Sequence, residues 1–185
     1  MDIDEVIDAT RCWVIETVVG LNLCPFAAVP VKAGLIRYVV CHESDSDGIY
    51  RALLKELDAL IDLPEEDVEA SLLIVPVGLD AFSDYLDMLD AAEVAIAEAG
   101  LDGVFQLASF HPNYLFEGSD DSDPANYTNR SPYPMFHLIR EAPLEQALKA
   151  CPEPEKIPQR NMALLREMGL EAMQERLNAC RKRRC

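Results

Sequence analysis

The sequence lacks any run of apolar residues that approaches about 18, the length needed to span a membrane. It also lacks a basic segment and an apolar segment behind its first residues, so we predict no secretory signal. None of its six cysteines belongs to a Cys-x-x-Cys pair, which argues against a zinc ribbon or a redox dithiol. From these absences we expect a soluble cytoplasmic protein with reduced thiols, no required disulfide and no membrane partner.

Positive charge is missing between Lys55 and Arg130. Residues 1–129 carry 26 acidic and 5 basic side chains, a net charge of -21, whereas residues 130–185 carry 7 acidic and 11 basic ones, a net charge of +4. Such an acidic protein does not coat nucleic acid, so we expect no nucleic-acid partner. The basic residues 181–185 are predicted to form a frayed, solvated end.

The pattern of apolar residues predicts one α/β domain over residues 1–185. Three strands are predicted over 35–41, 72–77 and 104–110, with helices between them that begin near Ser46 and Asp80. This βαβαβ order predicts a small, mainly parallel three-stranded sheet. The strand over 72–77 is apolar throughout, as is typical of a central strand.

Helices are predicted at both ends of the chain. Helical spacing indicates an N-terminal helix over residues 3–21. A C-terminal helical segment over residues 134–180 is predicted to pack on the sheet, with proline at the first helical position of three of its helices. We expect these helices to span 134–140, 143–150, 158–168 and 170–180.

About twenty residues without a periodic pattern follow the third predicted strand and end near Pro134. This stretch is rich in aromatic residues, which disordered segments rarely contain, so we interpret it as an ordered loop of a functional site. Ligands of open parallel sheets bind beyond the carboxyl ends of the strands. His42 and His111 follow two of these ends, and His111 also opens the loop.

Three side chains are candidates for catalysis: His111, Cys24 and His137. His111 has the position of a general base or metal ligand, although it could equally hydrogen-bond its own loop. Cys24 precedes Pro25 and could be an activated nucleophile, but most free cysteines are simply buried. His137 lies on the helix predicted from Pro134, where pairing with Glu141 on the surface is the alternative to catalysis.

Two arginines in this region are candidates for binding an anionic substrate, because a guanidinium group holds carboxylate or phosphate in a bidentate fork. Arg130 is preceded by the polar side chains of Asn129 and Tyr127, and Arg140 lies three residues after His137. We predict that four side chains line one cavity, with Cys24 close by. They are His111, Arg130, His137 and Arg140. In the alternative, Arg130 clamps an aspartate of the cluster at residues 120–123 and only holds the loop closed.

Several long motifs resemble the bacterial family called domain of unknown function 1415. They are Leu23-Cys24-Pro25-Phe26-Ala27, the segment from Phe105 to Pro112, the segment from Tyr127 to Pro134, and Ile157-Pro158-Gln159-Arg160-Asn161. The resemblance extends over nearly the whole chain. It implies a compact, single-domain bacterial protein, and it implies no activity, cofactor or catalytic residue.

Two functions are compatible with these patterns. The first is an enzyme that acts on a small anionic substrate, with Arg130 and Arg140 as anchors and His111 as acid or base. A metal-binding variant of this site would use Cys24, His111 and His137 as ligands. The second is a non-catalytic structural or partner-binding protein whose loop is clamped internally.

Overall fold

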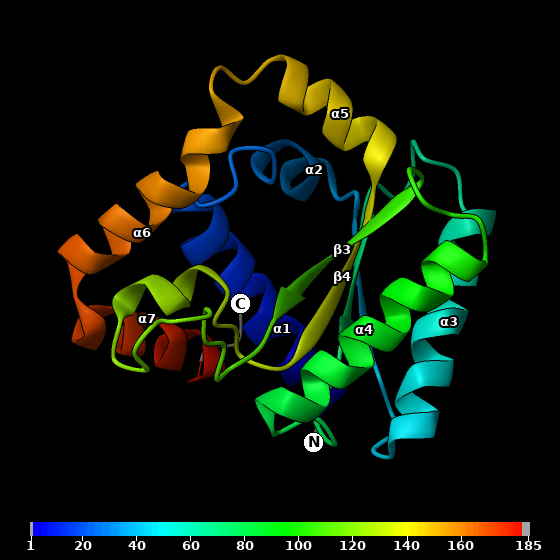
Figure 1. Ribbon diagram of the computed structural model, residues 1–185, viewed down its shortest axis with the longest axis horizontal. Helices are drawn as coiled ribbons and strands as arrows, with labels where there is room; N and C mark the ends of the chain where they lie inside the picture. The colour runs from blue at the N-terminus through cyan, green and yellow to red at the C-terminus, as the bar shows by residue number, and fades with distance from the viewer. Residues whose placement is uncertain (1, 183–185) are drawn as a thin grey trace.

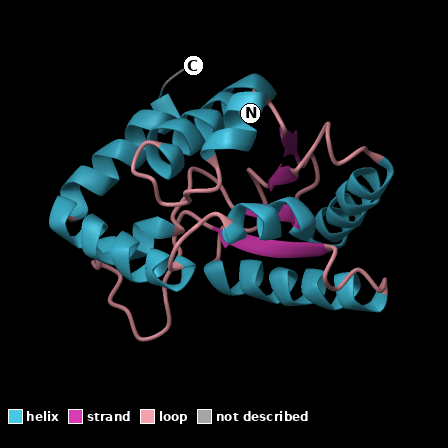
Figure 2. Ribbon diagram, turned by 90° about the horizontal axis from the view of Figure 1, so that it is seen from above, coloured by secondary structure: helices cyan, strands magenta, loops and turns pink. Residues whose placement is uncertain are grey.

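The computed structural model describes residues 2–182, in which helices flank a four-stranded sheet on both faces (Figures 1 and 2). The strands are β1 (Ile36–Val40), β2 (Ala70–Ile74), β3 (Phe105–Phe110) and β4 (Met135–Arg140). The helices are α1 (Ile3–Trp13), α2 (Ala28–Ala33), α3 (Ser46–Asp62), α4 (Phe82–Glu98), α5 (Glu141–Lys149), α6 (Ile157–Met168) and α7 (Leu170–Lys182). A π-helical turn over Val14–Val19 continues α1, and 3-10 turns span Pro124–Thr128 and Pro154–Lys156.

The sheet has the order β1-β2-β4-β3. β1 and β2 are parallel, as predicted, and β4 is antiparallel to both β2 and β3. The three predicted strands therefore run in one direction, and their carboxyl ends lie at one edge of the sheet. The predicted three-stranded, mainly parallel sheet is wrong in one respect: β4 is inserted between the second and third strands and makes the sheet mixed.

The helix predicted over residues 134–140 is in fact strand β4. Its residues Met135, Phe136 and Leu138 are fully buried, and alternate side chains face opposite layers of helices. A short apolar run buried on both faces carries no periodicity that separates a strand from a helix. Pro134 precedes the strand instead of starting a helix, and its carbonyl accepts a hydrogen bond from the N–H of Val75.

Each face of the sheet has its own core. Leu72, Ile74 and Met135 pack with residues of α1, α6 and α7 on one face, including Trp13, Leu165 and Met173. On the other face, Leu73 and Phe136 pack against α3 and α4. Every residue of β2 is buried, which agrees with its predicted central position. Neighbouring residues on each strand point into different cores, one on each face of the sheet. Candidate site residues can therefore meet only if their side chains lie on the same face.

The segments that flank this scaffold differ in part from the prediction. α2 was not predicted, since it is short and contains Pro30. No residue of α5 is fully buried, and α5 arches from the end of β4 over the region of α2 (Figure 1). The prediction of a frayed end over residues 181–185 is wrong for Arg181, which belongs to α7 and donates hydrogen bonds to the carbonyl of Pro132. Residues 183–185 lie outside the part of the chain that the structure describes. Within residues 2–182, no helix is long and apolar enough to cross a membrane.

Candidate functional site

A small cavity lies on the α2 side of the sheet and is bordered by three of the predicted site residues, Cys24, His137 and Arg140. Cys24 belongs to the loop that leads from the π-helical turn into α2, and His137 lies in the middle of β4. The cavity has a volume of about 90 Å³, and most residues around it are apolar. Its walls are formed by Phe26, Ala27, Pro30, Ile36, Glu69, Ala70, Ile139, Arg140, Pro143, Leu144 and Ala147 in addition to Cys24 and His137.

His137 is the unusual side chain of this cavity. Its imidazole has no hydrogen-bond partner among residues 2–182, and its only ring contact there is with Phe110, at 6.0 Å between centroids. His137 is half-buried, and desolvation by the surrounding protein lowers its pKa to about 4, because the charged form loses hydration. At neutral pH the imidazole is therefore uncharged, with a lone pair free to accept a proton.

The thiol of Cys24 is also affected by its surroundings. Burial raises its pKa, while hydrogen bonds from the N–H groups of Phe26 and Ala27 act in the opposite direction. Cys24 is thus protonated at rest, but the two N–H groups are placed to stabilise negative charge on its sulfur. Glu69, which directly precedes β2, is the only carboxylate among the residues that line the cavity.

Arg140 borders the same cavity, but its guanidinium group points toward the end of α3. Its Nε donates to the carbonyl of Val68 at 2.9 Å, and another nitrogen donates to the carbonyls of Leu60 and, at 2.6 Å, Leu63. The group also stacks over the ring of Phe105, 5.4 Å from its centroid. Arg140 therefore caps the C-terminus of α3, where the helix dipole makes a positive charge favourable.

A wider groove of about 600 Å³ adjoins the cavity between α2 and α5. The two share several wall residues, Phe26, Pro30, Glu69, Pro143 and Ala147, and the groove continues to Ala150, Cys151 and Pro152. The lining of the groove is again mainly apolar. A ligand could place one end in the cavity and extend its remaining part along this groove.

His111 lies away from this cavity and is fully buried. Its Nε2 hydrogen-bonds the carbonyl of Leu79 at 2.9 Å, and its Nδ1 accepts the N–H of Asn113 at 3.0 Å. This pairing requires the neutral imidazole with its proton on Nε2, and burial lowers the pKa of His111 in agreement. His111 thus holds its own loop together, which is the alternative considered above, and it has no free nitrogen for catalysis.

The loop between β3 and β4 is ordered, as predicted, but it is clamped internally. Arg130 donates to the carbonyl of Tyr114 at 3.0 Å, pairs with Asp121 at 2.6 Å, and lies over the ring of Tyr127. Asn129 donates to the carbonyl of Ser109. Arg130, Tyr127 and Asn129 do not line the cavity, so the predicted cavity with all four histidine and arginine residues is wrong.

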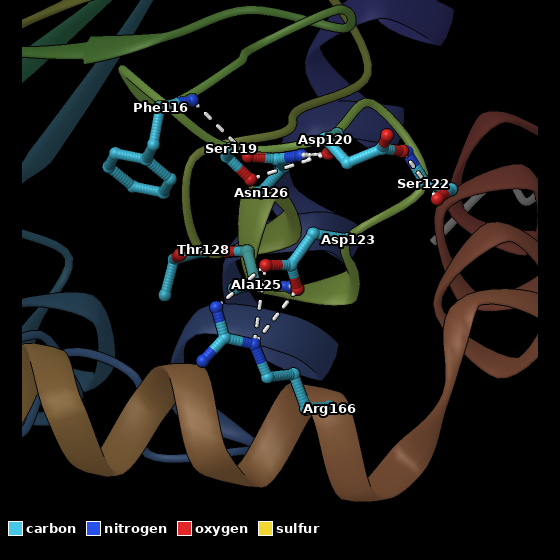
Figure 3. Close-up of polar contacts among 9 residues, drawn as sticks. All are labelled: Phe116, Ser119, Asp120, Ser122, Asp123, Ala125, Asn126, Thr128 and Arg166. Atoms are coloured by element: carbon cyan, nitrogen blue, oxygen red, sulfur yellow. Dashed lines mark hydrogen bonds and ion pairs between the residues drawn. The ribbon is translucent and has the colours of Figure 1, made fainter.

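The acidic part of this loop is held by further polar contacts (Figure 3). Asp123 forms a bidentate ion pair with Arg166 of α6 and also accepts the N–H of Ala125. The side-chain amide of Asn126 donates to the carbonyl of Asp120 and accepts the N–H of Phe116. These contacts fasten the loop to α6 and leave no side chain of the cluster pointing at the cavity with Cys24.

The predicted metal site of Cys24, His111 and His137 is not formed. His137 faces the core that contains α1, whereas the His111 ring packs against Tyr85 and Phe82 of α4 on the other face. Within residues 2–182 no group of three or more His, Cys, Asp and Glu residues could hold a metal ion. The five described cysteines form no disulfide with one another, and Cys185 lies outside the described residues.

With this geometry established, comparisons with known proteins add one finding. A family model described as a protein of unknown function (DUF1415) matches residues 5–175. The chain belongs to this family. Comparison with curated proteins and with solved structures gave no match.

Within this DUF1415 chain, the sequence did not point to two parts of the cavity. α5 supplies Leu144 and Ala147 to one wall, and Glu69 lies at the start of β2. Both are separated from Cys24 by more than one element of the fold, and neither carries a motif. The apolar residues of α5, which directly follow the strand that carries His137, could have indicated this wall of the cavity. They were not connected with His137 because the sequence of β4 was interpreted as a helix.

Proposed function

We propose that the protein is an enzyme that uses the Cys24 thiol as a nucleophile on a small, mainly apolar acyl compound, with His137 as the proton acceptor. The observation that carries this proposal is the imidazole of His137, which has no hydrogen-bond partner among residues 2–182 and borders the same mainly apolar cavity as Cys24. A base within hydrogen-bond reach of a thiol activates it as a nucleophile, and the shared cavity supports this role for His137 toward Cys24.

The chemistry can be assigned to these side chains. The sulfur of Cys24 attacks the carbonyl carbon of an ester or thioester while its proton moves to the free nitrogen of His137. The N–H groups of Phe26 and Ala27 stabilise the charge that develops on the sulfur. The proton then passes to the departing alcohol or thiol, which leaves the acyl group as a thioester on Cys24. Water or a second nucleophile releases the acyl group and restores the thiol.

The shape of the site supports an apolar substrate more than an anionic one. A cavity of about 90 Å³ holds a group of only a few non-hydrogen atoms, and the adjoining groove offers apolar contacts for the rest. The expectation of an anionic substrate depended on Arg130 and Arg140. Their guanidinium groups are engaged by carbonyl groups of the protein and by Asp121, so the proposal does not assign them to the substrate.

The test is acylation by 4-nitrophenyl esters of increasing chain length, followed by nitrophenolate release and by the intact mass of the protein. We expect a rapid phase that places one acyl group on Cys24, is absent in Cys24→Ala, and slows by about 10²–10⁴-fold in His137→Gln. Cys151→Ala is the matched control, because Cys151 is also incompletely buried and lines the adjoining groove. Acylation of Cys24 no faster than that of Cys151, or unchanged in His137→Gln, would contradict the proposal.

A further inference from the structure

The outer edge of β1 is open along its length. β1 is the first strand in the order of the sheet and pairs only with β2. Hydrogen bonds at Leu35 and Cys41 direct the odd-numbered residues toward β2, so the N–H and C=O groups of Ile36, Tyr38 and Val40 point away from the sheet. These groups have no partner among residues 2–182, and every residue of β1 is at least partly exposed, whereas all of β2 is buried.

A groove of about 390 Å³ runs beside this edge, between β1 and α3, and it contains a cluster of positive charge. Arg37 extends into it from β1, and Arg51 and Lys55 extend from one face of α3, four residues apart. Only five basic side chains occur in residues 1–129, where the net charge is -21, and three of the five border this groove. A random scatter of so few cations would not gather them at one open strand edge.

Two of these three cations form no ion pair with the protein's own acidic groups within residues 2–182. Arg51 and Lys55 are exposed and form no ion pair within residues 2–182. Arg37 pairs through its Nε with the buried Glu56, and its side chain remains 42% exposed. Glu43, the other carboxylate that borders the groove, lies against Gly48 in the first turn of α3, whereas Lys55 lies about two turns further along the helix. The groove is lined by three cations and two carboxylates, so its lining keeps a positive charge on an otherwise acidic protein. Arg51 and Lys55, which have no ion pair among residues 2–182, can therefore attract an acidic partner.

We propose that this edge binds an extended, acidic segment of another protein, which adds to the sheet as a strand beside β1. Such a segment gains main-chain hydrogen bonds from the free groups of β1, and its side chains alternate between the two faces of the sheet. Acidic side chains on the α3 face would meet Arg37, Arg51 and Lys55. Apolar side chains on the other face would lie beside Ile36, Tyr38 and Val40, which face the α1 core.

Charge argues against a second copy of this chain as the occupant. Pairing of two β1 edges would bring together two sets of these cations, and it would join two chains that each carry a net charge of -17. An acidic peptide brings the missing charge without this repulsion. A nucleic acid also carries negative charge, but it cannot form a β-ladder with β1, and the experiment distinguishes the two.

The experiment measures the binding of a fluorescent peptide that alternates valine with glutamate, by anisotropy at low salt. Two further peptides carry N-methyl groups on all glutamates or on all valines, so that one of them loses every N–H group that faces β1. We expect one N-methylated peptide to lose binding and the other to retain it. Equal binding of all three peptides would overturn strand addition, and so would full competition by a single-stranded oligonucleotide without any effect of N-methylation.

Charge reversal tests the groove itself. We expect R51E combined with K55E to weaken peptide binding by about tenfold or more, because two attractive contacts become repulsive. The matched control, K149E combined with K156E, changes the net charge equally at exposed positions away from the groove and should leave affinity unchanged. An equal loss in both double variants would show that only net charge matters and would refute the proposal.

Discussion

His137 makes a specific prediction about acid stability, which can be tested without any knowledge of a substrate. Its pKa is lowered from 6.5 to about 4 in the folded protein. The unfolded chain therefore binds more protons than the folded protein between these two values, and stability falls as the pH decreases through this window. The contribution is fully present above the unfolded pKa and is lost progressively below it.

The size of the effect follows from the two pKa values. Integration over the shift gives a loss of about 2 kcal/mol in the free energy of unfolding between about pH 7 and pH 4.5 that is due to His137 alone. The pKa of the buried His111 is also lowered, so this residue adds a loss of the same sign. A variant that lacks only His137 should still show the loss of stability on acidification that is due to His111.

The assay is urea unfolding of the wild-type protein and of His137→Phe at both pH values. The phenyl ring keeps the shape of the imidazole, so the variant should fold and lose about 2 kcal/mol less than the wild type on acidification. His42→Gln is the control, because His42 is exposed and its removal should not change the difference. If His137→Phe lost as much stability as the wild type, the imidazole could not be a desolvated, unpartnered group.

Three further predictions concern backbone, loop and thiols. Gly78→Ala should lower the free energy of unfolding by about 3 kcal/mol, because Gly78 has φ +105° and a Cβ would lie 2.3 Å from the carbonyl oxygen of Ser44. Gly118 also has a positive φ but faces open space, so Gly118→Ala should cost only about 1 kcal/mol. Urea unfolding measures both changes. Arg130→Met should cost about 2 kcal/mol and Asp121→Asn less than about 1 kcal/mol, since Arg130 is buried and the Asp121 side chain is 86% exposed. The thermal midpoint should be equal with and without reductant, and a large drop on reduction would contradict the prediction that no disulfide is required.

Patterns with a clear period led to the correct elements. Helices α3 and α4 and the strands of the βαβαβ order follow from the spacing of their apolar residues, and the parallel pairing of β1 and β2 follows from the crossover between them. β4 could not be recognised in this way, because both of its faces are buried and its apolar run is as short as a helical turn or two. The mixed order of the sheet is a consequence of that one strand.

The candidate site was predictable only in part for the same reason. A histidine at the end of a strand, such as His111, has the sequence pattern of a catalytic base, but its two hydrogen bonds to Leu79 and Asn113 depend on contacts that no local pattern encodes. The two explanations considered for Arg130 differ only in which partner the guanidinium reaches. Its contacts with Tyr114 and Asp121 are set by the path of the loop.

The pairing of Cys24 with His137 shows how a single topological feature can create a site. β4 enters the sheet between β2 and β3, its odd-numbered residues face the layer that contains α2, and His137 and Cys24 border the same cavity. On a helix, His137 and Arg140 would share one face; on a strand, they face opposite layers. Arg140 still borders the cavity, but its guanidinium group caps α3, and the imidazole of His137 has no hydrogen-bond partner among residues 2–182. Because the guanidinium group is engaged at α3 and the uncharged imidazole borders the cavity of Cys24, we propose an apolar acyl substrate in place of an anionic one.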